Sequence, residues 1–165
     1  MNFAFKCVSG RGPPFVVLLH TEEPPSAAKW ESYVVALTEM LARETGVVHV
    51  FVATDGGGPN SSQRGRLAQV VSRGATQALT HVFTDDLLVR SIVAAFRMLT
   101  RAYAIAHAPR TFASVCVEYG FTPQTVIDEF NECQRSFPLV KMLQDFEASV
   151  RASHPRAGGT PPAGP

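Results

Sequence analysis

Two apolar stretches with different patterns open the chain. Residues Phe3–Val8 alternate between apolar and polar positions, whereas Phe15–His20 form one continuous apolar run. Alternation is typical of a strand with one solvated face, and a continuous run is typical of a strand covered on both faces. Two glycines and two prolines lie between them in segment 9–14, which indicates a turn. We therefore expect an antiparallel hairpin at the start of the fold.

Helical spacing and apolar runs alternate after this hairpin. A first helix is predicted to begin after Ser26, a preferred N-cap residue, and to end at Gly46 in a left-handed C-cap. Its inward positions are Trp30, Val34, Leu37 and Leu41. Further apolar runs predict strands at Val47–Thr54, Ala78–Phe83 and Tyr103–Ala108.

Three more helices are expected between and after these strands. One runs from Asn60 or Ser61 to Gly74, and another starts at Pro109 and ends at Gly120. The helix between them has its predicted inward positions at Leu88, Ile92, Ala95, Phe96 and Leu99. The resulting order, β-β-α-β-α-β-α-β-α, predicts an α/β fold with a mixed, mostly parallel sheet covered by helices.

Residues 121–150 predict an added pair of helices. Thr122 and Pro123 suit an N-cap and a first helical residue, and Pro138 interrupts the pattern. The apolar positions on either side are Val126, Ile127, Phe130, Phe137, Leu139, Leu143, Phe146 and Val150. These helices either complete the core or form a surface for a homodimer or another partner. We therefore divide the chain into a domain at 1–120, a helical extension packed on it at 121–150, and a disordered tail at 151–165, where Pro and Gly abound.

Composition narrows the function classes. Charged residues make up 18% of the chain and the net charge is +1, which provides no general field for nucleic acid. No apolar run of about 18 residues predicts a membrane span, and the N-terminus lacks a signal-peptide pattern. The cysteines Cys7, Cys116 and Cys133 are odd in number and widely spaced, which favours buried thiols and a cytoplasmic location.

The segment Thr54–Arg64 is the most distinctive local feature. Asp55 is followed by Gly56, Gly57 and Gly58, and a predicted helix then begins near Asn60, Ser61 and Ser62. Glycines allow close approach of another group, and a helix N-terminus offers free N–H groups to an anion. Three interpretations stay open: an ordinary capped connection, a partner contact controlled by phosphorylation, and a site for a small anionic ligand. Neither a Walker loop nor a GxGxxG fingerprint is present.

An acidic edge is expected beside this turn. Glu22, Asp55, Asp85 and Asp86 all follow apolar strands, and the carboxyl ends of parallel strands meet at one edge of the sheet. Grouped carboxylates suit Mg²⁺, whereas the alternative is that Asp85 and Asp86 cap the following helix. The histidines show no metal spacing, and His49 and His81 are expected to be half-buried, hydrogen-bonded side chains within strands. No catalytic set is recognisable, so we expect neither an enzyme nor a cofactor.

The element order and the strand–turn–helix motif TDGGGPNSSQR resemble the STAS domain of bacterial anti-sigma-factor antagonists, over about residues 3–120. In that family an Asp and a phosphorylated Ser occupy this turn, so the resemblance implies roles for Asp55 and for Ser61 or Ser62, with Arg64 beside a phosphate. It implies a cytoplasmic bacterial regulator that binds a protein partner of the kinase or regulator type. Two alternatives remain. SEC14-like relatives carry apolar ligands, which implies a small-molecule or lipid-binding module, and the acidic edge resembles that of a Mg²⁺-dependent, phosphate-handling receiver.

Overall fold

The five strands form one sheet in the order β1-β2-β3-β4-β5. The strands are β1 (Phe3–Val8), β2 (Phe15–His20), β3 (Val48–Thr54), β4 (Ala78–Phe83) and β5 (Tyr103–His107). β1 and β2 pair antiparallel, and the three later pairings are parallel. This confirms the predicted α/β class with a mixed, mostly parallel sheet. The computed structural model describes residues 2–10, 12–73, 76–100, 103–134 and 141–153.

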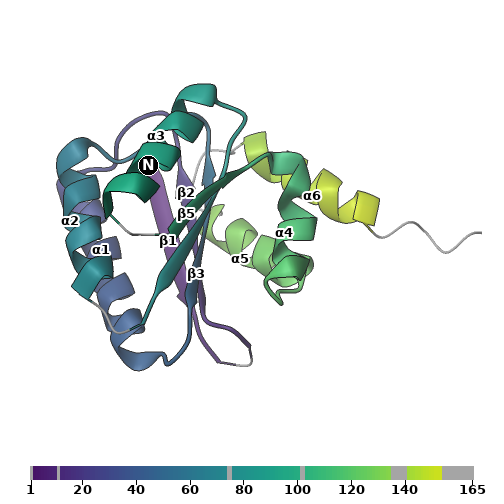
Figure 1. The fold of residues 1–165 in the computed structure, drawn as a ribbon. Coiled ribbons are helices and arrows are strands. Elements are labelled where there is room, and N and C mark those ends of the chain that lie inside the picture. The colour runs from purple at the N-terminus through teal and green to yellow at the C-terminus, as the bar shows by residue number, and fades with distance from the viewer. Residues whose placement is uncertain (1, 11, 74–75, 101–102, 135–140, 154–165) are drawn as a thin grey trace, which may run out of the picture.

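Helices cover both faces of the sheet. The helices are α1 (Ala27–Arg43), α2 (Ser61–Arg73), α3 (Leu87–Thr100), α4 (Phe112–Glu118), α5 (Pro123–Gln134) and α6 (Lys141–Ser153), with a short 3₁₀ turn at Pro109–Thr111 before α4. Each step from β2 to β5 moves one strand in the same direction, and right-handed crossovers then place α1, α2 and α3 on one face. α4, α5 and α6 lie on the opposite face (Figure 1). The fold is therefore a three-layer α/β/α arrangement.

The alternating side chains of β2 contribute to two separate cores. Val16 and Leu18 pack with α1, whereas Phe15, Val17 and Leu19 pack with α4, α5 and α6. All six residues of β2 are buried, as its continuous apolar run predicted. The α1 core is rich in aromatic rings near the N-terminus, where Phe3, Trp30 and Tyr33 meet.

The C-terminal helices form part of the second core. Phe146 of α6 stacks on Phe112 of α4, with ring centroids 4.2 Å apart and an interplanar angle of 8°. Phe130 of α5 and Phe83 of β4 also contact Phe146 edge-on or tilted. The helices after Gly120 therefore cover one side of the sheet together with α4. Phe137, Pro138 and Leu139 lie outside the described residues.

Local details both confirm and correct the expected boundaries. Ser26 caps α1 by accepting a hydrogen bond from the Lys29 N–H, as predicted. Gly46 is not the left-handed C-cap that we expected, because α1 already ends at Arg43 with extended backbone at Glu44. α6 continues through Ser153, so the first three residues of the expected tail are helical.

Three predicted inward positions of α3, at Leu88, Ile92 and Ala95, are exposed, and the side chains of Phe96 and Leu99 lie outside the described residues. Leu88 and Ile92 are exposed, at 68% and 39% of their surface, whereas Val89 is buried. The helical spacing was predicted correctly. The aliphatic stripe of α3 is wide enough to include both Leu88 with Ile92 and Val89, so the sequence does not show which of these positions faces the sheet. No helix in the described ranges combines the length and the apolar character that crossing a membrane requires.

Candidate functional site

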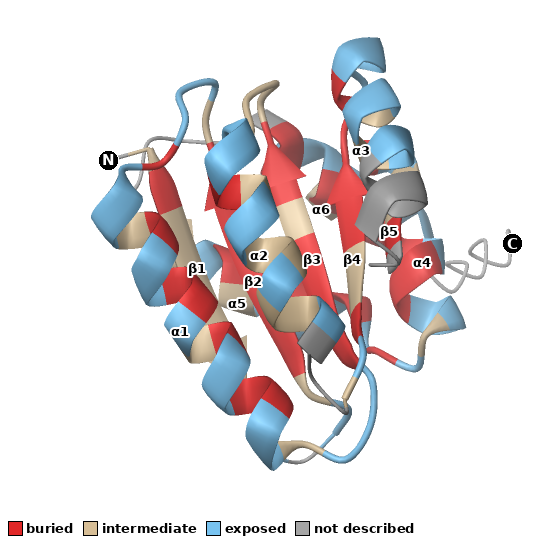
Figure 2. Ribbon diagram, turned by 60° about the vertical axis from the view of Figure 1, so that its left-hand side comes forward, coloured by how far each residue is buried: buried red, intermediate tan, exposed pale blue. Residues whose placement is uncertain are grey.

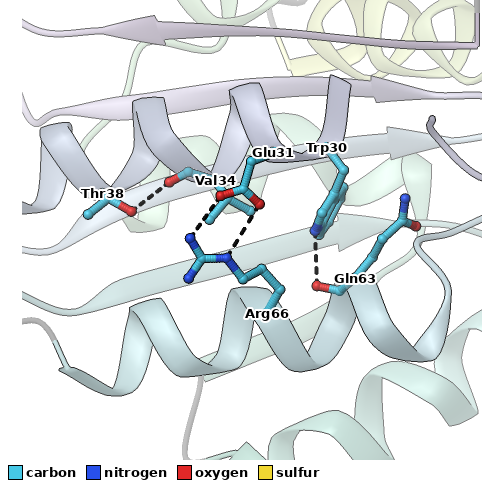
Figure 3. Close-up of polar contacts among 6 residues, drawn as sticks. All are labelled: Trp30, Glu31, Val34, Thr38, Gln63 and Arg66. Carbon is cyan, nitrogen blue, oxygen red and sulfur yellow. Dashed lines mark hydrogen bonds and ion pairs between the residues drawn. The ribbon is translucent and has the colours of Figure 1, made fainter. Parts of the chain in front are cut away.

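Gln63 anchors the start of α2 to α1. Its side-chain Nε2 donates to the Pro25 carbonyl at 2.7 Å, and its own carbonyl accepts from the Trp30 indole N–H at 2.9 Å. Figure 3 shows the indole contact beside an ion pair in which Arg66 donates to the Glu31 carboxylate at 2.8 and 3.3 Å. Gln63 is only 7% exposed, so the anchor is a buried contact between two helices.

The same glutamine completes the cap of α2. Asn60 Oδ1 accepts from the Gln63 N–H, and Gln63 Oε1 accepts from the Asn60 N–H, both at 2.9 Å. This is the reciprocal capping box, which satisfies two otherwise free N–H groups. The expected helix from Asn60 or Ser61 therefore begins at Ser61, with Asn60 as its cap.

The glycine turn before α2 is tightly packed against the loop after β2. Gly56 has φ of 117°, a conformation that favours glycine. A Cβ atom at Gly57 would overlap the carbonyl oxygens of Thr21 and Glu22, whereas Gly58 has open space around it. Thr54 Oγ1 donates to the Gly57 carbonyl at 2.8 Å and accepts from the Gly56 N–H. Two of the three glycines are therefore required by the backbone path itself.

The predicted phosphorylation positions are exposed to solvent. Ser61 and Ser62 are exposed in the first turn of α2. Arg64 donates from Nη1 to the Pro59 carbonyl at 2.5 Å, and Arg66 pairs with Glu31. Both arginines are thus engaged within the protein, although they lie close to the two serines in the sequence.

An apolar cavity of about 230 Å³ lies between α2 and α3. Its floor is the sheet itself, because the lining includes residues of β2, β3, β4 and β5. Figure 2 shows β3 and β4 between the two helices. The floor residues are Leu18, Val52, Thr80, Val82 and Ala104. α2 supplies Arg64 and Leu67, and α3 supplies Leu88, Val89, Ile92 and Val93.

The end of the cavity nearest α1 is closed by larger rings. His20, Trp30 and Tyr33 form this end, and Thr54 with Gly56–Pro59 forms the rim. The His20 imidazole is 1% exposed, and its Nδ1 lies 2.5 Å from the Thr21 carbonyl. Burial lowers the pKa of His20, while the bond to Thr21 acts in the opposite direction. This histidine is consequently a neutral polar group at the end of an apolar cavity.

The acidic edge is a second hollow on the other side of the same turn. Glu22, Asp55, Asp85 and Asp86 line a space of about 430 Å³, which Asp145 of α6 joins. The sequence therefore correctly predicted that these carboxylates gather. Asp86 also caps α3, since its Oδ1 accepts from the N–H groups of Leu88 and Val89 at 2.7 and 3.3 Å.

Three histidines form a hydrogen-bonded row beneath α4. His49 Nδ1 lies 3.0 Å from His81 Nε2, and His81 Nδ1 lies 3.2 Å from His107 Nε2. Each facing pair of nitrogens shares one proton, so these ring nitrogens already have hydrogen-bond partners within the row. Burial lowers the pKa of all three, and His81 falls to about 3 because its histidine neighbours add to the effect. No group of three or more potential ligands among the described residues is arranged to hold a metal ion.

The thiols are protonated side chains of the packed structure. Cys116 is buried, and burial raises its pKa to about 12. Burial also raises the pKa of Cys133, to about 11, and that of Cys7. Because the thiolate is the reactive form, these shifts favour the interpretation of unreactive cysteines.

Three features of this region were not predicted from the sequence. Gln63 was expected only as part of the motif, although Asn60 and a glutamine three residues later are a recognisable capping signal. His20 was given no role, because a polar residue that ends an apolar run is common. Leu88 and Ile92 were expected in the core, whereas they are exposed and line the cavity.

Comparisons with known proteins identify no relative of this chain. No family model matches the chain, and no curated protein or solved structure matches it. The resemblance to the STAS domain therefore stays a prediction, and functional inference rests on the cavity and its neighbouring residues.

Gln63→Glu should destabilise the fold. Glutamate serves as well as glutamine in a capping box, but its oxygen cannot donate to the Pro25 carbonyl and would face it as a second acceptor. We expect a loss of about 2–3 kcal/mol in the free energy of unfolding by urea denaturation. The same substitution at the exposed Gln69 of α2 is the control and should change stability by less than about 0.5 kcal/mol. Equal effects at both positions would contradict the anchor.

The stability of the fold should fall as the pH drops below about 6.5. Unfolded histidines take up protons near that pH, whereas His20, His49, His81 and His107 take them up at lower pH in the fold because their pKa values are lowered. The unfolded state then binds more protons, so protonation favours unfolding.

His81→Gln removes the histidine with the lowest pKa from this set. Between pH 7.5 and pH 5 the variant should lose about 2 kcal/mol less stability than the wild type, which denaturation at several pH values measures. The comparison concerns the pH dependence, because the lost hydrogen bonds lower stability at every pH. A pH dependence identical to that of the wild type would show that His81 does not carry it.

Proposed function

We propose that this chain is a binding module for a small, largely apolar molecule that occupies the cavity between α2 and α3. The observation that carries the proposal is an apolar cavity whose floor includes Val52, Val82 and Ala104 of the sheet and whose walls are two helices. Ligand sites in proteins are concave and mostly apolar, with a few polar groups that fix orientation. His20, Thr54 and Arg64 are such groups here.

The size of the cavity sets the size of the ligand. A dry apolar cavity of about 150 Å³ holds one benzene molecule. The cavity here measures about 230 Å³, so it suits a body of roughly nine or ten carbon atoms, such as a two-ring aromatic. A longer molecule would extend past Leu88 and Ile92, whose exposed side chains continue the apolar surface beyond the mouth.

The arrangement of the helices supports a preformed ligand cavity rather than a gap left by imperfect packing. α2 is fixed by Gln63, and α3 is fixed at its start by Asp86, so the two helices are held apart by separate caps. The rim is equally fixed, because Gly57 is wedged against the loop after β2. A preformed site reduces the ordering that binding would otherwise require.

Val52→Phe should block the cavity. Val52 is a partly buried floor residue, so a phenyl ring there would project into the space that a ligand needs. We expect binding of 2-methoxynaphthalene, followed by its fluorescence, to weaken about tenfold or more. Val117→Phe, at a 66% exposed position of α4, makes the same change on the opposite side of the sheet and should bind like the wild type.

The experiment has two contrary outcomes. Equal affinity of the two variants would place the probe elsewhere on the protein. Absence of binding to the wild type, with native mass spectrometry of the purified protein also showing no bound small molecule, would reject the proposed function.

A regulatory protein-interaction module of bacterial cytoplasm is the second candidate. It is supported by Ser61 and Ser62, which are exposed together in the first turn of α2, where a phosphate would meet the positive end of the helix dipole. Leu87 and Leu88 add an exposed apolar contact beside the same cavity, at 76% and 68% exposure. Neither candidate includes a chemical reaction or a cofactor.

Charge at the two serines tests this second candidate. Partner sets captured by the wild type, by Ser61→Ala with Ser62→Ala, and by Ser61→Asp with Ser62→Asp should differ if phosphorylation controls binding. We expect the doubly aspartate-substituted protein to lose or gain at least one partner relative to the alanine form, by quantitative mass spectrometry. Identical partner sets for all three proteins would remove the switch.

A further inference from the structure

We infer that the cavity between α2 and α3 selects an uncharged ligand that carries a hydrogen-bond donor, such as an apolar alcohol or phenol, and that His20 Nε2 accepts this hydrogen bond. The inference rests on the proposed function, since it names the class of molecule that the cavity takes. It is carried by a buried polar atom that the protein leaves without a partner.

The tautomer of His20 follows from its neighbour. A carbonyl oxygen can only accept, so at 2.5 Å from the Thr21 oxygen the His20 Nδ1 must carry the proton. A neutral imidazole then has a bare lone pair on Nε2. The ring is 1% exposed, and among the described residues Nε2 has no hydrogen-bond partner.

The other polar groups of the cavity do not supply the missing proton. The Thr54 hydroxyl donates to the Gly57 carbonyl at 2.8 Å, and Arg64 Nη1 donates to the Pro59 carbonyl. Phe3 packs edge-on against the His20 ring, with centroids 5.9 Å apart, and Trp30 and Tyr33 line the same cavity. Buried acceptors in native proteins are nearly always satisfied, so an unmet one on a residue that lines a cavity points to a bound donor.

The rest of the wall explains why the ligand should be uncharged. A charged group among Leu18, Val52 and Val82 would lose its hydration without a dedicated counter-ion. A lone-pair acceptor also repels a carboxylate or a phosphate, whereas a hydroxyl or phenol proton matches it. Arg64 provides the competing possibility of an anion at the rim, and the test includes that possibility.

Three probes with the same two-ring body separate these cases. 2-Naphthol has a donor, 2-methoxynaphthalene has none, and 2-naphthoate carries a negative charge. We expect the wild type to bind 2-naphthol about tenfold more tightly than 2-methoxynaphthalene at pH 7, because one buried acceptor gains its partner. His20→Phe keeps a planar ring against Phe3 but removes the acceptor, so the preference for 2-naphthol over 2-methoxynaphthalene should vanish.

The outcomes distinguish the inference from the proposed function. Equal binding of 2-naphthol and 2-methoxynaphthalene by the wild type would overturn the donor rule and leave the apolar cavity as a site. Tightest binding of 2-naphthoate would overturn the rule in favour of an anion held by Arg64. Binding of none of the three would reject the site and the inference together. His20→Phe also loses the bond to Thr21, so Val52→Phe, which keeps His20, is measured with the same probes. Val52→Phe should weaken the binding of 2-naphthol and of 2-methoxynaphthalene by the same factor.

Discussion

The buried Gln63 is the contact on which the open face of this protein depends. One side chain caps α2 through Asn60 and ties it to the loop before α1 through Pro25, while the Gln63 carbonyl holds the Trp30 indole. These bonds fix α2 beside α1, over β3. α3 is capped separately by Asp86, and its buried residue Val89 faces the sheet near β4 and β5. The strands between the two helices therefore keep part of their apolar surface uncovered.

The two faces of the sheet illustrate different solutions to the same burial requirement. On one face Phe83, Phe112, Phe130 and Phe146 fill the space under α4, α5 and α6. On the other face the large aromatic rings are concentrated under α1, and the side chains that face the cavity from β3, β4 and β5 are small. Small floor residues beneath two separated helices leave a volume that protein atoms do not occupy. A cavity at this position is thus a consequence of where the large residues are placed.

The sequence predicted the elements well and their packing less well. Continuous apolar runs identified β2, β3 and β4, and capping residues correctly marked the starts of α1 and α5 at Ser26 and Pro123. The gathering of Glu22, Asp55, Asp85 and Asp86 also followed from parallel strands. The outward face of α3 could not be predicted, because its apolar stripe exceeds what the sheet covers. The row His49–His81–His107 depends on the register of three strands, which no local pattern contains.

The most direct test of the account is to locate a bound apolar probe by NMR in protein with labelled methyl groups. We expect intermolecular NOEs from the ring protons of 2-naphthol to the methyls of Val52, Val82 and Leu67, which line the cavity. NOEs confined to Leu87, whose side chain is exposed outside the cavity, or to Met142 beside the acidic hollow, would contradict it.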